Sequence, residues 1–169
     1  MNKHTMITII ATVTIIVPFV YSAMNIYAAE QLKYNWNKPE DFAFFDVLNG
    51  GNIQLCNTVP YYANFKNLQI TIIYDEKSRG EFSINDIGID GLQSKIMKGK
   101  FHSDDFLESQ HLFMTMDFQF NGGDMRVDSS KLFVIVSIDT PIIGIIPYTT
   151  TNQYSGIEFD QLMMQDFQC

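Results

Sequence analysis

Five side chains with metal-binding chemistry lie between residues 102 and 111. Two are imidazoles and three are carboxylates: His102, Asp104, Asp105, Glu108 and His111. A helix over residues 102–110 would bring Glu108 and His111 to one face, but a metal ion also needs converging ligands and groups that orient them. The same carboxylates suit the first turns of a helix capped by Ser103, where they meet the positive end of the helix dipole. We therefore predict a solvated helix start here, with no metal and no cofactor.

A second set of candidate ligands overlaps the first. His111, Met114 and Met116 carry the imidazole and thioether groups that suit copper(I). Residues 111–120 alternate in a way typical of a strand, and in a strand His111 faces away from both methionines, which join the core face. The sequence therefore predicts a core strand over residues 111–120 rather than a copper site.

Short motifs that accompany common catalytic sites are absent from the sequence. It contains no GxSxG, no Walker loop, no GxGxxG and no HExxH. The 19 acidic residues could supply paired carboxylates for hydrolysis, but no spacing singles out one pair. We predict that the protein is not an enzyme, and we assign it no catalytic residue.

Cys56 and Cys169 are the two cysteines of the chain. In an oxidising compartment they could form a disulfide, and a closed loop of that length stabilises a fold by about 4–5 kcal/mol in the chain-entropy treatment. A free, buried Cys56 beside Leu55 is the alternative, because a disulfide also needs the two Cα atoms to approach closely. Neither cysteine lies in a motif for a catalytic thiol, and the sequence leaves the disulfide and the free thiol open.

An uncharged run over residues 6–29 decides where the rest of the chain lies. A hydrocarbon core of about 30 Å needs about 20 apolar residues in a helix, and the run is long enough. Its hydroxyls can bond to the preceding helical turn, and Pro18 is tolerated as a kink. A cleaved signal peptide with Lys3 as its positive region is the alternative, but Tyr21 and Tyr27 occupy positions where a cleavage site needs small residues. We predict a retained membrane anchor.

Both alternatives export the remainder of the chain. We predict a single-pass protein of the cell membrane whose following domain lies outside the cytoplasm. Lys3 is the only charged residue before residue 30, so the remainder keeps 10 of the 11 basic and all 19 acidic side chains, a net charge of about −9. Such acidity repels phosphate backbones and excludes nucleic acid as a partner. The expected partners are membrane lipid around the helix and, in addition, other membrane proteins.

Beyond the run, short segments of alternating polarity lie between turn residues, a pattern typical of β-strands. Residues 49–51 and 121–124 are tight-turn sequences rich in Asn and Gly, and residues 75–80 form the turn of the clearest hairpin. Residues 142–146 form a further apolar segment, and residues 156–169 fit either a last strand or a short amphipathic helix. The predicted strands are residues 41–48, 52–56, 68–74, 81–87, 94–101, 111–120, 125–128 and 131–139.

About seven to nine short strands in about 140 residues favour an antiparallel β-sandwich of immunoglobulin-like type, with a closed barrel as the alternative. The predicted fold class is thus mainly β, preceded by one N-terminal transmembrane helix. Charged segments such as residues 94–100 would protect edge strands from pairing with other chains. We divide the chain into a membrane anchor over residues 1–29, a juxtamembrane linker over residues 30–40 and a β-sandwich domain over residues 41–169.

Four segments of the domain carry a family resemblance: residues 55–60 (LCNTVP), 65–75 (FKNLQITIIYD), 80–83 (GEFS) and 98–101 (KGKF). Together they resemble a LEA14-like domain, also called WHy for water stress and hypersensitive response, over residues 53–138. In that family a strand ends at an Asn-Pro-rich loop, and the next strand carries a Tyr-Asp-Gly hairpin. This sequence has Thr58 and Val59 between Asn57 and Pro60, and it has Glu76 in place of the usual glycine.

The resemblance implies an immunoglobulin-like fold without catalysis, associated with stress protection or partner binding. The layout also resembles small single-anchor proteins of ammonia-oxidising archaea. We predict a membrane-anchored, exported, non-catalytic module that acts in binding or in envelope and stress protection. The alternative is an accessory subunit of a larger membrane complex, held by helix packing through Thr8, Thr12, Ser22 and Ala23.

Overall fold

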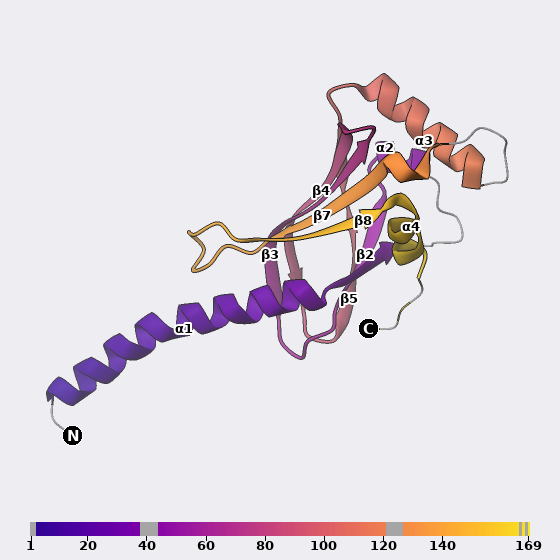
Figure 1. The fold of residues 1–169 in the computed structure, drawn as a ribbon. Coiled ribbons are helices and arrows are strands. Elements are labelled where there is room, and N and C mark those ends of the chain that lie inside the picture. The colour runs from indigo at the N-terminus through magenta and orange to yellow at the C-terminus, as the bar shows by residue number, and fades with distance from the viewer. Residues whose placement is uncertain (1–2, 38–43, 121–126, 166, 168) are drawn as a thin grey trace.

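A computed structural model describes residues 3–37, 44–120, 127–165, 167 and 169 (Figure 1). A long helix, α1 (Lys3–Gln31), comes first, and two antiparallel sheets with eight strands follow in this part of the chain. The predictions of a mainly β fold and of a helix before it are confirmed at this level, and the two sheets are consistent with a β-sandwich. In Figure 1, α1 leaves the sheets in one direction, whereas α3 (Phe106–Phe120) lies on the opposite side of the domain.

The smaller sheet has the strand order β1-β2-β5 and is antiparallel throughout. Its strands are β1 (Lys33–Trp36), β2 (Asn52–Asn57) and β5 (Gln93–Lys98). Leu32 alone separates α1 from β1. The linker predicted over residues 30–40 therefore contains the first strand of the domain, and the helix joins the sheet almost directly.

The larger sheet has the strand order β6-β4-β3-β7-β8. Two of its strands, β3 (Ala63–Tyr74) and β4 (Lys77–Ile89), form the predicted hairpin. Asp75 and Glu76 make its two-residue turn with φ values of 52° and 62°, the backbone that fits the twist of a hairpin. The remaining strands are β6 (Lys100–His102), β7 (Leu132–Asp139) and β8 (Thr149–Ser155).

Alternate side chains of both sheets form the core. Trp36 of β1 meets Phe82 of β4 edge to face, with ring centroids 5.8 Å apart, so one aromatic contact joins the two sheets. The chain passes from β5 in one sheet to β6 in the other at Gly99, where a β-carbon would lie 2.0 Å from the Phe82 ring. The inward-facing side chains of β7 are those that the sequence predicts: Leu132, Val134, Val136 and Ile138.

The strand predicted over residues 111–120 is wrong, because these residues belong to α3. Met114 and Phe118, which a strand would bury, are 55% and 54% exposed. The helix predicted over residues 102–110 also begins later than expected, and Asp105 caps it in place of Ser103, since its Oδ1 accepts from a backbone N–H three residues on, at 3.1 Å. The buried side chains of α3 follow a helical spacing: Ser109, Leu112, Phe113 and Met116.

The strand predicted over residues 41–48 is wrong for residues 44–48, which form α2 (Phe44–Leu48), and its first three positions lie outside the described residues. The carboxylate of Asp117 accepts from the backbone N–H groups of Phe44 and Phe45 at 2.5 and 2.9 Å. A side chain of α3 therefore caps α2 from about seventy residues away in the sequence, a contact with no local signal.

Three elements in the second half of the chain were not fully predicted from the sequence. β8 is not among the predicted strands, because this edge strand is rich in Thr and exposed along most of its length. Residues 156–169 contain α4 (Gly156–Met164), which Ser155 and Glu158 begin with a capping box. Residues 129–131, at the start of the strand predicted over 131–139, form the short 3₁₀ helix η2 (Ser129–Lys131). The turn predicted over residues 121–124 lies outside the described residues, as do the first two positions of the strand predicted over 125–128.

Candidate functional site

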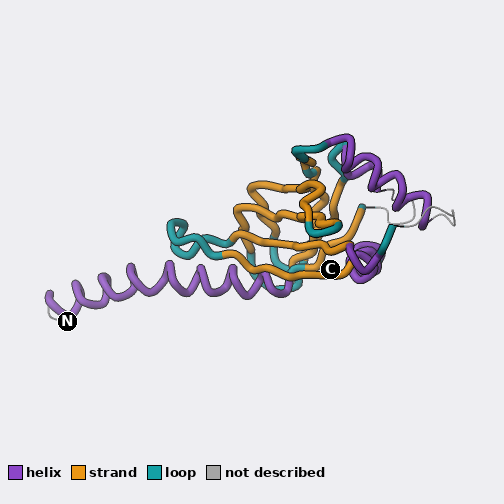
Figure 2. Tube along the Cα trace, turned by 45° about the horizontal axis from the view of Figure 1, so that its top comes forward, coloured by secondary structure: helices purple, strands orange, loops and turns teal. Residues whose placement is uncertain are grey.

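α1 consists of two segments with different surroundings (Figure 2). The projecting segment, residues 3–21, is exposed at every position except the partly buried Pro18. The docked segment, residues 22–31, buries one face of the helix, formed by Ser22, Asn25, Ala28 and Ala29. α1 is long and apolar enough to cross a membrane. At about 1.5 Å per residue the projecting segment is about 28 Å long, close to the hydrocarbon thickness of about 30 Å.

Hydrogen bonds fix the docked segment to the domain. Asn25 Oδ1 accepts from the backbone N–H of Asn64 in β3 at 3.1 Å. The hydroxyl of Tyr61 donates to the carbonyl of Met24 at 3.0 Å. Desolvation and the nearby Tyr27 raise the pKa of Tyr61, which favours the protonated hydroxyl that this bond requires. The end of α1 is therefore a part of the folded domain.

Two threonines of the projecting segment form hydrogen bonds within the helix. Thr8 and Thr14 each donate to the backbone carbonyl four residues earlier, at 3.0 and 2.9 Å, as the sequence predicts for hydroxyls in a membrane helix. Ser22 does the same to Pro18 at 2.8 Å, and its Oγ also accepts from the backbone N–H of Ile143 at 2.8 Å. Ser22 thus marks the point where the polar contacts of α1 turn from the helix to the domain.

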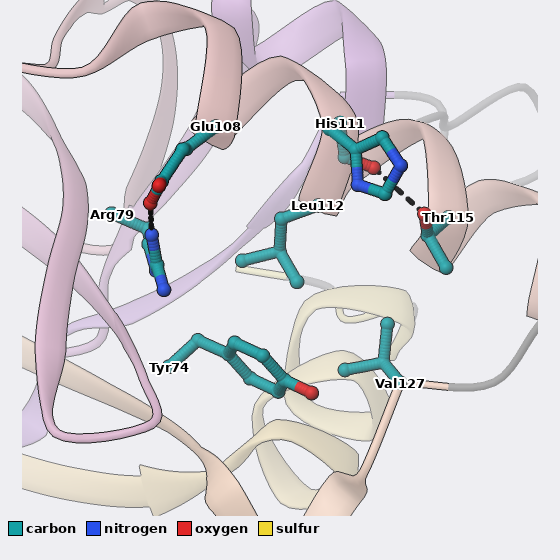
Figure 3. A pocket seen from close by; sticks show the side chains of 7 residues that line it. All are labelled: Tyr74, Arg79, Glu108, His111, Leu112, Thr115 and Val127. Carbon is teal, nitrogen blue, oxygen red and sulfur yellow. Dashed lines mark hydrogen bonds and ion pairs between the residues drawn. The ribbon is translucent and has the colours of Figure 1, made fainter.

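A pocket of about 360 Å³ lies at the far end of the domain, between the β3–β4 hairpin and α3 (Figure 3). Arg79 of β4 forms an ion pair with Glu108 of α3, and its guanidinium carbon lies 6.0 Å from the ring centroid of Tyr74. The Arg79 side chain is 16% exposed, and its buried Nε has no hydrogen-bond partner among the described residues. Leu112 and Val127 complete an apolar wall beside this ion pair (Figure 3).

The side chains that line this pocket define the contacts that a ligand could make. Arg79 can present a donor to a carboxylate or phosphate group, but such a ligand competes with Glu108 for the guanidinium. The hydroxyl of Thr115 donates to the backbone carbonyl of His111 at 2.8 Å, so its proton points into the helix (Figure 3). A nucleophile would need that hydroxyl to face a base instead.

The five candidate ligands of residues 102–111 have separate contacts. Asp105 caps α3, and Glu108 pairs with an arginine of β4. His102 Nε2 lies 3.7 Å from Asp104 Oδ1, with both side chains largely exposed, and His111 lies at the rim of the pocket. In the part of the chain that the structure describes, no group of three His, Cys, Asp or Glu side chains is placed to hold a metal ion.

The three candidate copper(I) ligands, His111, Met114 and Met116, are also separated into two groups. Met116 is 3% exposed and belongs to the core, whereas His111 and Met114 lie on the exposed side of α3. A copper(I) site would need all three groups on one side of the helix. The helix therefore separates these ligands, although for a different reason than the predicted strand.

Cys56 and Cys169 form a disulfide, with their Cα atoms 5.6 Å apart. Of the two alternatives that the sequence leaves open, the structure contains this one. The bond ties the segment after α4 to the buried strand β2, and Asn35 supports the same segment by donating to the carbonyl of Gln165 at 2.9 Å. The disulfide thus joins the buried Cys56 of β2 to the exposed Cys169 and is part of the domain's fold.

Sequence reasoning did not single out Arg79, Asp117 or Asn25, which make these contacts. One available signal is that Asp117 is a lone carboxylate among apolar residues of α3, and a partly buried charge needs partners. Asn25 gave a similar signal as an amide inside an otherwise apolar run. Arg79 had no local signal, because its partner is on a different element.

The sequence matches no protein-family model and no curated protein. In three dimensions the chain is similar to a crystal structure of a protein from Archaeoglobus fulgidus, at 14% identity and a TM-score of 0.31. The similarity covers 73% of this chain and 94% of that one. It is too weak to carry an argument about fold type or function, so the function is argued from the residues alone.

Proposed function

We propose that the protein is a membrane-anchored, exported binding module whose β-sandwich domain carries no catalysis. The observation that carries this proposal is the division of α1. Apart from Lys3 at its start, its projecting segment exposes an uncharged, mainly apolar surface close to bilayer length, and its docked segment is held by hydrogen bonds inside the domain. A helix built in this way serves as a single-pass anchor that holds the domain at the membrane surface.

The disulfide supports the export of the domain. Disulfides form and persist mainly in compartments outside the reducing cytosol, and Cys56 and Cys169 are paired. The acidic balance of the chain also suits a soluble exported surface. The module would act in binding or in envelope and stress protection, with the pocket beside Arg79 as its ligand-binding recess.

We place the sandwich in the immunoglobulin-like type and in the LEA14-like family as part of the same proposal. Two residues of the resemblance support it. The buried side chain of Asn57 donates to the carbonyl of Tyr61 at 2.8 Å and so holds the loop after β2. Asp75 lies in the hairpin turn after β3, where the family carries its Tyr-Asp-Gly sequence.

Membrane fractionation of cells that produce the full chain tests the anchor. Val13 lies in the middle of the projecting segment, and Val13→Arg should cost about 3 kcal/mol on insertion. We expect the wild-type protein to stay in membranes after alkaline carbonate extraction and Val13→Arg to be released. Leu107→Arg, on the exposed surface of α3, is the matched control and should be retained. Release of the wild-type protein by carbonate would contradict the proposal.

An accessory subunit of a larger membrane complex is the second candidate, and one observation favours it. α3 exposes an apolar stripe on the side of the domain away from α1, formed by Leu107, Met114 and Phe118 (Figure 1). Exposed apolar stripes often mark contacts between proteins. Native gels after mild solubilisation separate the two candidates. A discrete heavy complex that dissociates in Met114→Asp would favour the subunit, and migration as a single chain would favour the stand-alone module.

A further inference from the structure

The loop between β7 and β8, residues 140–148, lies beside the junction of the projecting and docked segments. Ile143 donates its backbone N–H to Ser22 Oγ at 2.8 Å. A hollow of about 380 Å³ is lined by Pro18 and Tyr21 from α1 and by Pro141 and other residues from the loop. Figures 1 and 2 both show the loop extending from the sheet in the same direction as α1 and alongside it.

The loop has the composition of a lipid-facing element. Residues 140–148 carry no charged side chain. Ile145 at the tip is 84% exposed, and Ile143 and Ile146 are exposed as well. A soluble loop normally presents polar residues, so this exposed isoleucine cluster needs a partner that is itself apolar.

The backbone N–H groups of the loop are satisfied without water. Thr140 donates to the carbonyl of Tyr148 at 2.9 Å, and Ile142 and Ile146 exchange hydrogen bonds at 2.8 and 3.0 Å. The N–H groups of residues 144 and 145 donate within the loop as well, and that of residue 143 is the one held by α1. Residues 141 and 147 are prolines, which have no N–H. Every backbone donor from residue 140 to 147 is therefore used, which lowers the cost of entering a region poor in water.

The backbone at the tip is unusual for the residue it carries. Ile143 has φ +56°, in the left-handed region that β-branched side chains rarely adopt, and the following glycine has φ +73°. Asn or Gly at position 143 would remove this strain. Strained positions of this kind persist where the side chain itself has a role, and here that side chain is an exposed apolar group beside α1.

We infer that the loop of residues 140–148 inserts into the boundary between lipid headgroups and acyl chains, as a second membrane contact beside α1. This inference rests on the proposed function, because it requires the projecting segment to span the bilayer. The bilayer surface then lies near Tyr21, and the loop tip reaches about one helical turn deeper, the depth typical of interfacial elements. Tyr21 and Tyr148 take the interfacial positions that tyrosine favours, and Lys66 at the base of the loop faces the headgroups.

Two membrane contacts fix the orientation of the domain on the bilayer, whereas a single helix would not. A single anchor lets a domain rotate and tilt on the membrane, whereas the loop and α1 together hold one end of the sandwich against the lipid. The pocket beside Arg79, which α3 lines, then lies on the side of the domain away from the bilayer, since α3 and α1 are on opposite sides (Figure 1). The loop thus keeps the proposed binding surface available to partners outside the membrane.

Depth-dependent fluorescence quenching in nanodiscs tests the inference. Single cysteines at exposed positions of the full chain, Ile145→Cys, Val17→Cys and Leu107→Cys, are labelled with an environment-sensitive dye, with the disulfide of Cys56 and Cys169 left intact. The nanodiscs contain phosphatidylcholine with or without a doxyl group near the carbonyl end of the acyl chain. Equal thermal unfolding of the three labelled proteins shows that each is folded.

We expect the labels at residues 17 and 145 to lose most of their fluorescence in doxyl nanodiscs and the label at residue 107 to keep its own. Quenching at residue 17 without quenching at residue 145 would overturn the inference and leave the anchor intact. Quenching at neither position would overturn the anchor as well, and the inference with it. Quenching at residue 107 equal to that at residue 145 would also overturn the inference, because the whole domain would then adsorb to lipid. Since these nanodiscs contain no other membrane-spanning protein, a loop that binds such a protein instead of lipid would leave residue 145 unquenched.

Discussion

The two segments of α1 belong to one continuous helix but differ in composition and in the way they satisfy their polar groups. Large aliphatic side chains dominate residues 6–21, whereas residues 22–31 are richer in Ala and in polar side chains. In residues 3–21 the hydroxyls of Thr8 and Thr14 bond back to the helix itself. In residues 22–31 the polar atoms of Ser22 and Asn25 accept hydrogen bonds from the domain. The difference teaches that the partners of the few polar side chains, together with the change in composition, locate the point where an exposed apolar helix becomes part of the folded domain.

Unfolding of the domain should therefore expose the docked segment to protease and leave the projecting segment protected. Cys169→Ser removes a cross-link that closes a loop with a sequence separation of 113 residues, and we expect the free energy of unfolding to fall by about 4 kcal/mol. At a temperature where only the variant is unfolded, proteolysis in nanodiscs should cut the docked segment and spare the projecting segment inside the bilayer. Wild-type protein treated with a reductant is the control and should behave as the variant does. Equal sensitivity of both segments would show that they are not distinct.

Two substitutions on α1, one in each segment, test the same difference between the docked and projecting segments. Asn25→Ala leaves the backbone N–H of Asn64 without its acceptor, and we expect a loss of about 1 kcal/mol in domain stability. Thr14→Ala, in the projecting segment, removes a bond that stays within the helix and should leave domain stability unchanged. Thermal unfolding in detergent, monitored by near-ultraviolet circular dichroism, measures both. A larger loss for Thr14→Ala than for Asn25→Ala would contradict the assignment of the segments.

Acidification should weaken the domain without affecting the anchor. The hydrogen bond and the charge of Lys131 lower the pKa of Asp75, and hydrogen bonds from Ser155 lower that of Glu158. A carboxyl whose pKa is lowered by folding contributes stability above its unfolded pKa of about 4, and this contribution is lost as the pH falls through the folded value. Asp75 in turn raises the pKa of Lys131, whose contribution is lost only as the pH rises through that raised value.

The effect is small because these carboxyls are exposed, and it is the smallest that we predict. The midpoint of thermal unfolding should decline below about pH 4, and Asp75→Asn should make the decline shallower. The projecting segment carries no carboxyl group, so membrane retention should not change over the same range. Release from the membrane on mild acidification would contradict this separation.

The membrane run and most strands could be predicted from the sequence because their signals are local. The absence of charge over residues 6–29 indicates a membrane helix, and the alternation of residues 131–139 predicts β7 and its inward face. The position of Ser22 as a boundary could not be predicted, since burial in lipid and burial in a domain both select apolar neighbours. Only the contact with Ile143, on a distant loop, distinguishes them.

The errors also have physical reasons. In residues 111–120 six of the ten positions are apolar, and their order fits a two-residue period as well as a helical period. The cap by Asp105 decides for the helix. α2 depends on the carboxylate of Asp117, which no local pattern indicates. The pocket beside Arg79 and the membrane contact of residues 140–148 likewise arise between elements that are far apart in the chain.

The most direct test of the division of α1 is a scan of exposed positions along the helix in nanodiscs. Single cysteines replace Val13, Phe19 and Tyr27, and each is probed with doxyl lipid and with a water-soluble maleimide. We predict that residues 13 and 19 are quenched by lipid and protected from maleimide, and that residue 27 reacts with maleimide and is not quenched. Lipid quenching at residue 27 equal to that at residue 13, or free reaction of residue 13 with maleimide, would contradict the account.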